Sequence, residues 1–233
     1  RALGTEAKEA GVPVVTYSLT RDADWRASDL QRGPDGGCTF MLWGPRIQKQ
    51  PALSVAMRLP GAHNVSNALA ALAAADFFGV SEAALLPILK VFSGVERRFE
   101  TKGNVDGVTV VDDYAHHPTE IRATLSAARL SFEQRPLWVL FQPHTFSRTK
   151  ALLAEFADSL GDADHLVLMD IFPSREVDDG LVSSADILEL MEHKSAYLVS
   201  THDAALRFLN EHLLSGDVLL TLGAGDVYRV GEQ

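Results

Sequence analysis

From residue 105 onward, the sequence alternates between short apolar runs and longer segments with helical periodicity. The apolar runs cover residues 105–111, 137–141, 165–169, 196–199 and 218–222. The helical patterns between them cover residues 118–130, 150–160, 184–192 and 203–214. Strands that are separated by helices of this length predict a mainly parallel sheet with right-handed crossovers and helices on both faces. The fold class of this part of the chain is therefore α/β.

The residues before this series have a different pattern. Helical periodicity is found at 2–10, 61–78 and 81–91, and strand character at 12–17, 39–42 and 47–59. Residues 22–37 are polar and turn-rich, and we expect a short buried strand at 12–17 and a β-meander or a pair of hairpins after it. Residues 92–98 resemble a junction, so we expect one domain at 1–94 and a second at 95–233. The helical pattern at 2–10 suggests that the chain begins inside a domain.

Composition excludes several classes of protein. The hydrophobic fraction of 46% is enough for a buried core, and the net charge of −10 argues against broad binding to nucleic acid or anionic membranes. No apolar run reaches the roughly 18 residues of a membrane span, and no signal peptide opens the chain. With Cys38 as its one cysteine, the chain cannot form an internal disulfide, which fits a cytoplasmic protein.

The segment DDYAHHP, residues 112–118, follows the first apolar run of the series. Ligands of open α/β sheets bind at the carboxyl ends of strands, so these polar side chains predict a functional loop rather than a plain turn. Asp112 or Asp113 could accept hydrogen bonds from ribose, and His116 or His117 could donate to a phosphate or carboxylate, or ligate a metal. A structural zinc site is not expected, because no second Cys or His cluster completes it.

The segment FQPHTFSRT, residues 141–149, takes the corresponding place after the next apolar run. Loops that follow neighbouring parallel strands form a single cleft. Arg148 could bind a small carboxylate through a bidentate pair, although an ion pair with a surface glutamate is the alternative.

Three further motifs have both a structural and a functional interpretation. Asn64 and Asn67 share a helix face and could read the edge of a purine base, or Asn64 could simply cap the helix. Arg97 and Arg98 could bind phosphate or form surface ion pairs. The segment LGAGD, residues 222–226, could approach a phosphate, but we favour a tight turn at the sheet edge.

Taken together and in this order, these segments resemble the Mur ligases. The matching segments are GAHNVSNALAA (61–71), GVERRFE (94–100), DDYAHHPTEI (112–121), FQPHTFSRT (141–149), DIFPSRE (170–176) and GDVLLTLGAGD (216–226). The resemblance implies that residues 1–94 are the C-terminal part of a central ATP-binding domain. Residues 95–233 would be the C-terminal Rossmann-like domain.

Within the family, the segments are most similar to the members that add the first amino acid in peptidoglycan synthesis. The resemblance implies an ATP-dependent amide-bond-forming ligase that joins L-alanine to the lactyl carboxylate of UDP-N-acetylmuramate through an acyl phosphate, with Mg²⁺. It implies that Asn64 and Asn67 contact adenine, that Asp113 contacts ribose, and that Arg97 or Arg98 lies near the nucleotide. Tyr114, His116 and Arg148 would line the place where L-alanine meets the reacting phosphate.

Two alternatives remain from the sequence. A murein peptide ligase would carry a similar loop at 112–118, and a nucleotide-binding module without activity would fit the lack of a phosphate-binding loop. The chain contains no G-x-x-x-x-G-K-[ST] sequence, so we expect it to be inactive alone.

Overall fold

The computed structural model describes residues 2–33, 36–45, 53–191 and 195–233. The chain divides into two compact units, Arg1–Ser93 and Gly94–Gln233. Among the described residues, no helix is both long and apolar enough to span a membrane.

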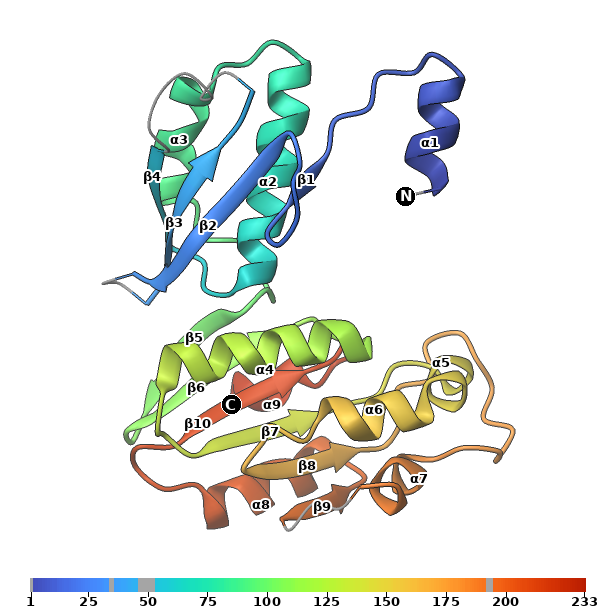
Figure 1. Ribbon diagram of the computed structural model, residues 1–233. Helices are drawn as coiled ribbons and strands as arrows, with labels where there is room; N and C mark the ends of the chain where they lie inside the picture. Colours follow the sequence, from blue (N-terminus) through green and yellow to red (C-terminus); the bar gives the residue numbers. More distant parts are fainter. Residues whose placement is uncertain (1, 34–35, 46–52, 192–194) are drawn as a thin grey trace. The chain divides into compact units, whose positions relative to one another are not determined.

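The first unit contains a four-stranded sheet with two helices packed on one face (Figure 1). Its strands are β1 (Tyr17–Ser18), β2 (Trp25–Arg32), β3 (Cys38–Trp43) and β4 (Leu53–Met57). Its helices are α1 (Ala2–Glu9), α2 (Ala62–Phe77) and α3 (Glu82–Val91). Strands β2, β3 and β4 form an antiparallel meander, as expected, and β1 pairs in parallel with β2. The core lies between this meander and the apolar faces of α2 and α3.

Two predictions for this unit were wrong. The buried strand expected at residues 12–17 is reduced to the two-residue β1, and Tyr17 is 47% exposed. The polar segment 22–37 contains β2, in which Trp25 and Ala27 are buried, Arg26 and Ser28 are partly buried and residues 29–32 are exposed. A strand with one solvated face has this period-two pattern. Because β2 has many polar residues, the sequence resembled a turn-rich segment. Residues 47–52 of the strand expected at 47–59 lie outside the described residues.

The second unit is a six-stranded sheet in the order β5-β6-β10-β7-β8-β9. Its strands are β5 (Glu100–Val105), β6 (Val108–Asp113), β7 (Leu137–Phe141), β8 (His165–Met169), β9 (Ala196–Val199) and β10 (Val218–Leu222). Its helices are α4 (Pro118–Phe132), α5 (Phe146–Ala151), α6 (Leu153–Ser159), α7 (Ser184–Glu189), α8 (His202–His212) and α9 (Tyr228–Gly231). Only β5 pairs antiparallel among these strands, so the predicted mainly parallel α/β sheet is confirmed.

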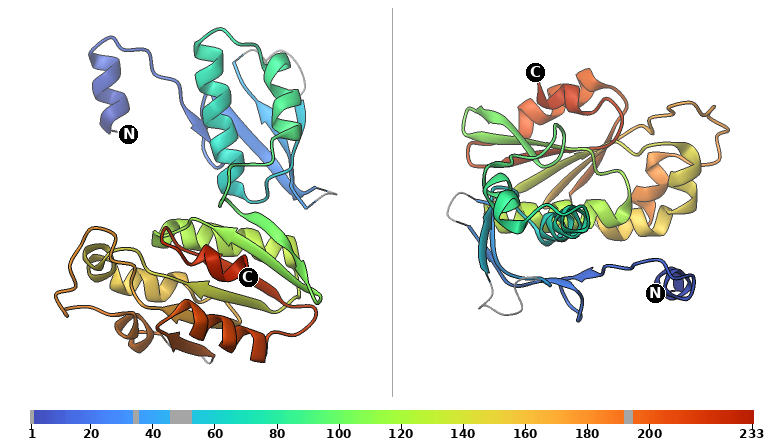
Figure 2. Two further views of the ribbon diagram at one scale, coloured as in Figure 1. Left: turned by 180° about the vertical axis from the view of Figure 1, so that it is seen from behind. Right: turned by 90° about the horizontal axis from the view of Figure 1, so that it is seen from above.

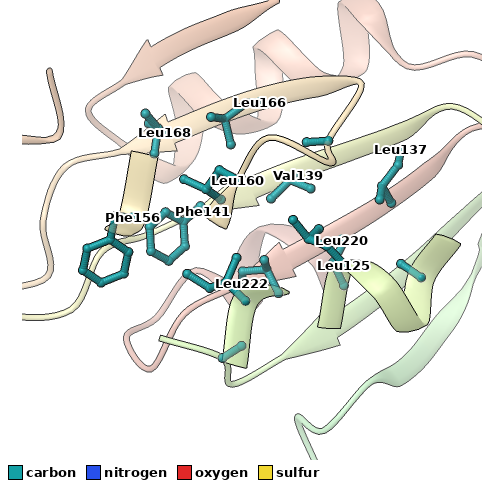
Figure 3. Packing of buried hydrophobic residues seen from close by; sticks show 14 of the residues in the cluster. Leu125, Leu137, Val139, Phe141, Phe156, Leu160, Leu166, Leu168, Leu220 and Leu222 are labelled. Carbon is teal, nitrogen blue, oxygen red and sulfur yellow. The ribbon is translucent and has the colours of Figure 1, made fainter. Parts of the chain in front are cut away.

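Helices cover both faces of this sheet (Figure 2). On one face, α4, α6 and α7 pack against the sheet through side chains such as Leu125, Phe156 and Ile187, and Figure 3 shows part of this cluster beside the central strands. On the other face, α8 and α9 pack over Leu140 and Leu219. Burial on both faces explains why the central strands are continuous apolar runs rather than alternating ones.

The structure corrects three details in this unit. The strand expected at 105–111 is a hairpin of β5 and β6, turned by Asp106 and Gly107 with positive φ angles of 51° and 87°. The helix expected at 150–160 is split at Leu152 into α5 and α6. The glycine turn expected at the sheet edge follows β10, which lies between β6 and β7 in the middle of the sheet.

Candidate functional site

Three loops leave the second unit's sheet at the same level. Leu222 at the end of β10 is in register with Asp113 of β6 and with Phe141 of β7. The loops that begin at residues 114, 142 and 223 therefore start side by side at the carboxyl edge, where parallel sheets bind ligands.

Four side chains from two of these loops form a continuous row. The ring centroids of Tyr114 and His116 are 5.3 Å apart, and those of His116 and His144 are 5.8 Å apart. Arg148 Nη1 lies 3.3 Å from Nδ1 of His144. The structure thus brings together Tyr114, His116 and Arg148, as the convergence of neighbouring strand ends predicted. We call these four side chains the Tyr114–Arg148 row.

His116 is held by its own loop and by the first turn of α4. Its Nδ1 lies 2.8 Å from the carbonyl oxygen of Tyr114 and 3.4 Å from Oε2 of Glu120, and Glu120 also accepts from the His116 amide. A proton on Nδ1 satisfies these acceptors and leaves Nε2 as the nitrogen that can accept a proton. His117 has a separate role, since its Nδ1 accepts from the Thr119 amide and caps α4, with Pro118 in the first turn.

His144 was not singled out by the sequence, although it directly follows the Gln-Pro pair after β7. Its ring stacks on Phe172 with centroids 5.7 Å apart, and its backbone bridges to the same residue. Burial lowers the pKa of His144, and the neighbouring Arg148 and His116 lower it further. A neutral imidazole next to the guanidinium leaves Arg148 as the positive charge of this pair.

Glu176 fixes the start of α5 from 29 residues away in sequence. Its carboxylate accepts from the amide of Ser147 at 2.9 Å and from the hydroxyl of Ser147 at 2.5 Å. The Ser147 hydroxyl, followed by the Ser147 amide, lowers the pKa of Glu176. No pattern in the sequence indicates this contact, which holds the residue directly before Arg148.

The two adjacent aspartates of the DDYAHHP segment are buried and hold different parts of the chain. Asp113, 4% exposed, accepts from the amides of Phe99 and Ala115, each at 2.7 Å. Burial raises the pKa of Asp113 to about 6, although these two hydrogen bonds and the nearby Arg98 act in the opposite direction. Asp112, 1% exposed, accepts from the Thr221 hydroxyl and pairs with Arg97. Holding the loop is therefore one role of Asp113, and the contact with ribose stays a prediction.

The two adjacent arginines point in different directions. The side chain of Arg97 is 19% exposed and turns inward to Asp112. Arg98 is exposed, and its guanidinium lies 5.4 Å from the centre of the Tyr114 ring. Whether either residue contacts a nucleotide stays a prediction.

Asn64 and Asn67 belong to α2 in the first unit. Asn64 is partly buried and donates from Nδ2 to the carbonyl of Pro60 at 2.8 Å, while Asn67 is exposed. The alternative in which Asn64 caps the helix is wrong, because the N-cap residue is Gly61 with a φ of 90°. Their contact with adenine stays a prediction.

The described residues contain no group of three or more His, Cys, Asp or Glu side chains that could hold a metal ion. Because Mg²⁺ is commonly held by one or two carboxylates together with substrate phosphates, the Mg²⁺ implied by the family resemblance stays a prediction. We assign no step of the chemistry to a metal held by these residues.

Two family models match the sequence. Residues 97–225 match the model described as "Mur ligase, glutamate ligase domain", and residues 1–75 match the Mur ligase middle domain. A curated UDP-N-acetylmuramate–L-alanine ligase from Caldanaerobacter subterraneus is 42% identical over 222 residues, which are 94% of this chain and 47% of that protein. The ligase of the same name from Agathobacter rectalis is 44% identical over 227 residues, 96% of this chain and 49% of that protein. The chain spans about half the length of the curated relatives it matches.

Two solved structures have the same fold. The UDP-N-acetylmuramate–alanine ligase of Thermotoga maritima superposes with a TM-score of 0.76 at 29% identity, covering 94% of this chain and 46% of that chain. A murein peptide ligase from Psychrobacter arcticus superposes with a TM-score of 0.68 at 28% identity, covering 98% of this chain and 48% of that chain.

Proposed function

Because the chain belongs to the Mur ligase family, we propose that the whole protein joins L-alanine to the lactyl carboxylate of UDP-N-acetylmuramate at the expense of ATP. The observation that carries this proposal is the Tyr114–Arg148 row at the carboxyl edge of the sheet. The curated relatives named for this activity, at 42% and 44% identity, support the choice of substrates.

The proposed reaction has two steps. The γ-phosphoryl group of ATP is transferred to a lactyl carboxylate oxygen, which gives an acyl phosphate and ADP. The amine of L-alanine then attacks the carbonyl carbon, and inorganic phosphate leaves as the amide forms. Such chemistry depends on positioning and on stabilising developing charge, which suits a site of Arg, His and Tyr without a nucleophilic Ser or Cys.

Each residue of the row has a chemical task in this scheme. Arg148 binds the carboxylate of L-alanine, and the Nε2 of His116 accepts a proton from its α-ammonium group, which leaves the neutral amine to attack the acyl phosphate. Tyr114 borders the same place. In the nucleotide site, Arg98 and Asp113 contact phosphate and ribose, and Asn64 and Asn67 contact adenine.

The domain assignment belongs to the same proposal. Residues 1–94 would be the C-terminal part of the central ATP-binding domain, and residues 95–233 the C-terminal domain. The two family models, which match residues 1–75 and 97–225, support this division.

A second candidate is a murein peptide ligase, which the structural similarity to the Psychrobacter arcticus protein favours. The two candidates differ in the group that is added to UDP-N-acetylmuramate, either a single amino acid or a peptide. A nucleotide-binding module without ligase activity is the third candidate.

Substrate competition in the whole protein distinguishes the three. Purified protein is incubated with ATP, Mg²⁺ and UDP-N-acetylmuramate, together with L-alanine or with a tripeptide, and phosphate release and product mass are measured. We expect phosphate release to require both UDP-N-acetylmuramate and L-alanine, with a product heavier by one alanine residue. Faster turnover with the tripeptide would favour the murein peptide ligase. Nucleotide binding without either product would favour the third candidate.

A further inference from the structure

We propose that Arg97 is a positioning residue, which holds Tyr114 and the glycine turn 223–225 in place, and is not a ligand of the nucleotide. This inference rests on the proposed function only for the role of the site that Arg97 holds in place. It separates two neighbouring arginines that the sequence treats as equivalent.

Contacts within the second unit occupy three of the five N–H donors of the Arg97 guanidinium. Nε pairs with the buried Asp112 at 2.8 Å, Nη2 donates to the carbonyl of Gly223 at 2.6 Å, and Nη1 donates to the carbonyl of Gly225 at 3.1 Å. The rings of Tyr114 and Tyr228 lie 5.0 Å and 4.5 Å from the guanidinium carbon. A guanidinium with three donors paired inside the protein and two aromatic rings beside it has fewer donors left for phosphate oxygens.

The glycine turn is also tightly packed against Gln142 and Phe172. A Cβ atom at Gly223 would lie 2.7 Å from the carbonyl oxygen of Gln142, and one at Gly225 would overlap the Gln142 side chain and Phe172. The Gln142 side chain also accepts from the amides of Asp226 and Val227. The turn is therefore held between Gln142 and Arg97, and removing Arg97 frees one of its two sides.

The backbone at Arg97 is also fixed to the site. Arg97 and Phe99 have positive φ angles of 58° and 49°, a region that residues with a Cβ adopt at a cost. The Arg97 amide donates to Glu100, its carbonyl accepts from the Tyr114 amide at 2.7 Å, and the Phe99 amide donates to Asp113. Arg97 thus links the loop after β6 to the turn after β10 through both its backbone and its side chain.

Arg98 supplies a matched control. It is adjacent in sequence and carries the same charge, but it is exposed, and its guanidinium lies 5.4 Å from the centre of the Tyr114 ring. Arg97→Lys and Arg98→Lys both keep the charge and lose the planar fork. Only the first change should loosen the glycine turn.

Amide hydrogen exchange of the 233-residue chain reads out the turn without relying on activity. We expect Arg97→Lys to speed exchange at Gly223, Asp226 and Val227 by about tenfold or more, the size of the loss of one hydrogen bond to a charged group. Arg98→Lys should leave exchange at these amides within about twofold of the original chain. Unchanged exchange in Arg97→Lys would overturn the proposal.

A double variant separates positioning from charge balance. Arg97→Gln alone leaves Asp112 buried without its partner and should lower Tm markedly. Arg97→Gln combined with Asp112→Asn should recover most of that Tm, while the turn still exchanges fast because its carbonyls have lost their donor. If the double variant recovered slow amide exchange in the turn as well as Tm, Arg97 would only balance the charge of Asp112. That result would contradict its role as a positioning residue.

Kinetics of the whole protein complete the test. Arg97→Lys should lower kcat and raise KM for L-alanine, with the affinity for ATP nearly unchanged. Arg98→Lys should instead lower the affinity for ATP. Weakened ATP affinity in Arg97→Lys with normal exchange would identify Arg97 as a nucleotide ligand. If the original protein has no ligase activity, the proposed function fails, but the exchange experiment still decides the role of Arg97.

Discussion

At the scale of single residues, Asp113 shows how burial and hydrogen bonding oppose each other. Two backbone amides stabilise its carboxylate, yet burial outweighs them and raises the pKa from 3.8 to about 6. A raised carboxyl pKa means that folding favours the protonated form of Asp113. Its contribution to stability is therefore largest in acid.

This gives a prediction about pH. Below the unfolded pKa of 3.8, Asp113 is protonated in both states, and between 3.8 and about 6 the unfolded state alone has lost the proton. Rising pH through this window therefore favours unfolding by about 3 kcal/mol at most, and the effect is complete above the folded pKa. Denaturant unfolding of the chain and of Asp113→Asn between pH 4 and 8 isolates the effect as the difference between their unfolding free energies. A difference that is constant across this range would show that Asp113 does not titrate there.

Arg148 carries the prediction for substrate binding. Next to His144, whose lowered pKa favours the neutral ring, Arg148 provides the positive charge for a substrate carboxylate. In the whole protein, Arg148→Ala should reduce kcat/KM for L-alanine by roughly tenfold to a hundredfold, with ATP binding less affected, because one charged contact is lost. Lys150→Ala is the matched control, since Lys150 is an exposed cation on the same helix and should have little effect. Equal kinetics for the original protein and Arg148→Ala would show that the carboxylate binds elsewhere.

At the scale of elements, the sequence predicts the strands that are buried on both faces, because burial makes them continuous apolar runs. The bounds of β7, β8, β9 and β10 agree with the expected residues 137–141, 165–169, 196–199 and 218–222. Three of the four, β7, β8 and β10, lie between other strands and have almost wholly buried residues, which gives continuous apolar runs. The strand β2 and the antiparallel edge strand β5 are half polar, so their pattern resembled loop or junction.

The candidate site was also predictable only in part. Loops that follow neighbouring strands must lie close together, which is why Tyr114, His116 and Arg148 could be grouped from sequence. Contacts between distant segments could not be foreseen, as with Glu176 on Ser147 or Tyr228 on Arg97. The two arginines at 97 and 98 look equivalent in the sequence, because the positive φ of Arg97 is not visible there.

At the scale of the whole molecule, the chain carries only part of the proposed catalytic apparatus. It contains the Tyr114–Arg148 row and the asparagines of α2, but its sequence has no G-x-x-x-x-G-K-[ST] loop to bind the β- and γ-phosphates of ATP. Phosphoryl transfer depends on such positioning, so its absence should lower the rate by at least about a thousandfold.

We therefore expect the 233-residue chain to release no phosphate above background with ATP, Mg²⁺, UDP-N-acetylmuramate and L-alanine, under conditions in which the whole protein turns over. Phosphate release is measured at equal molar concentrations of the two proteins. The same chain with Arg148→Ala identifies contaminating ATPases, because their activity does not depend on this residue. Alanine-dependent release by the chain that disappears in Arg148→Ala would contradict the prediction. It would mean that the phosphates of ATP are positioned by residues within this chain.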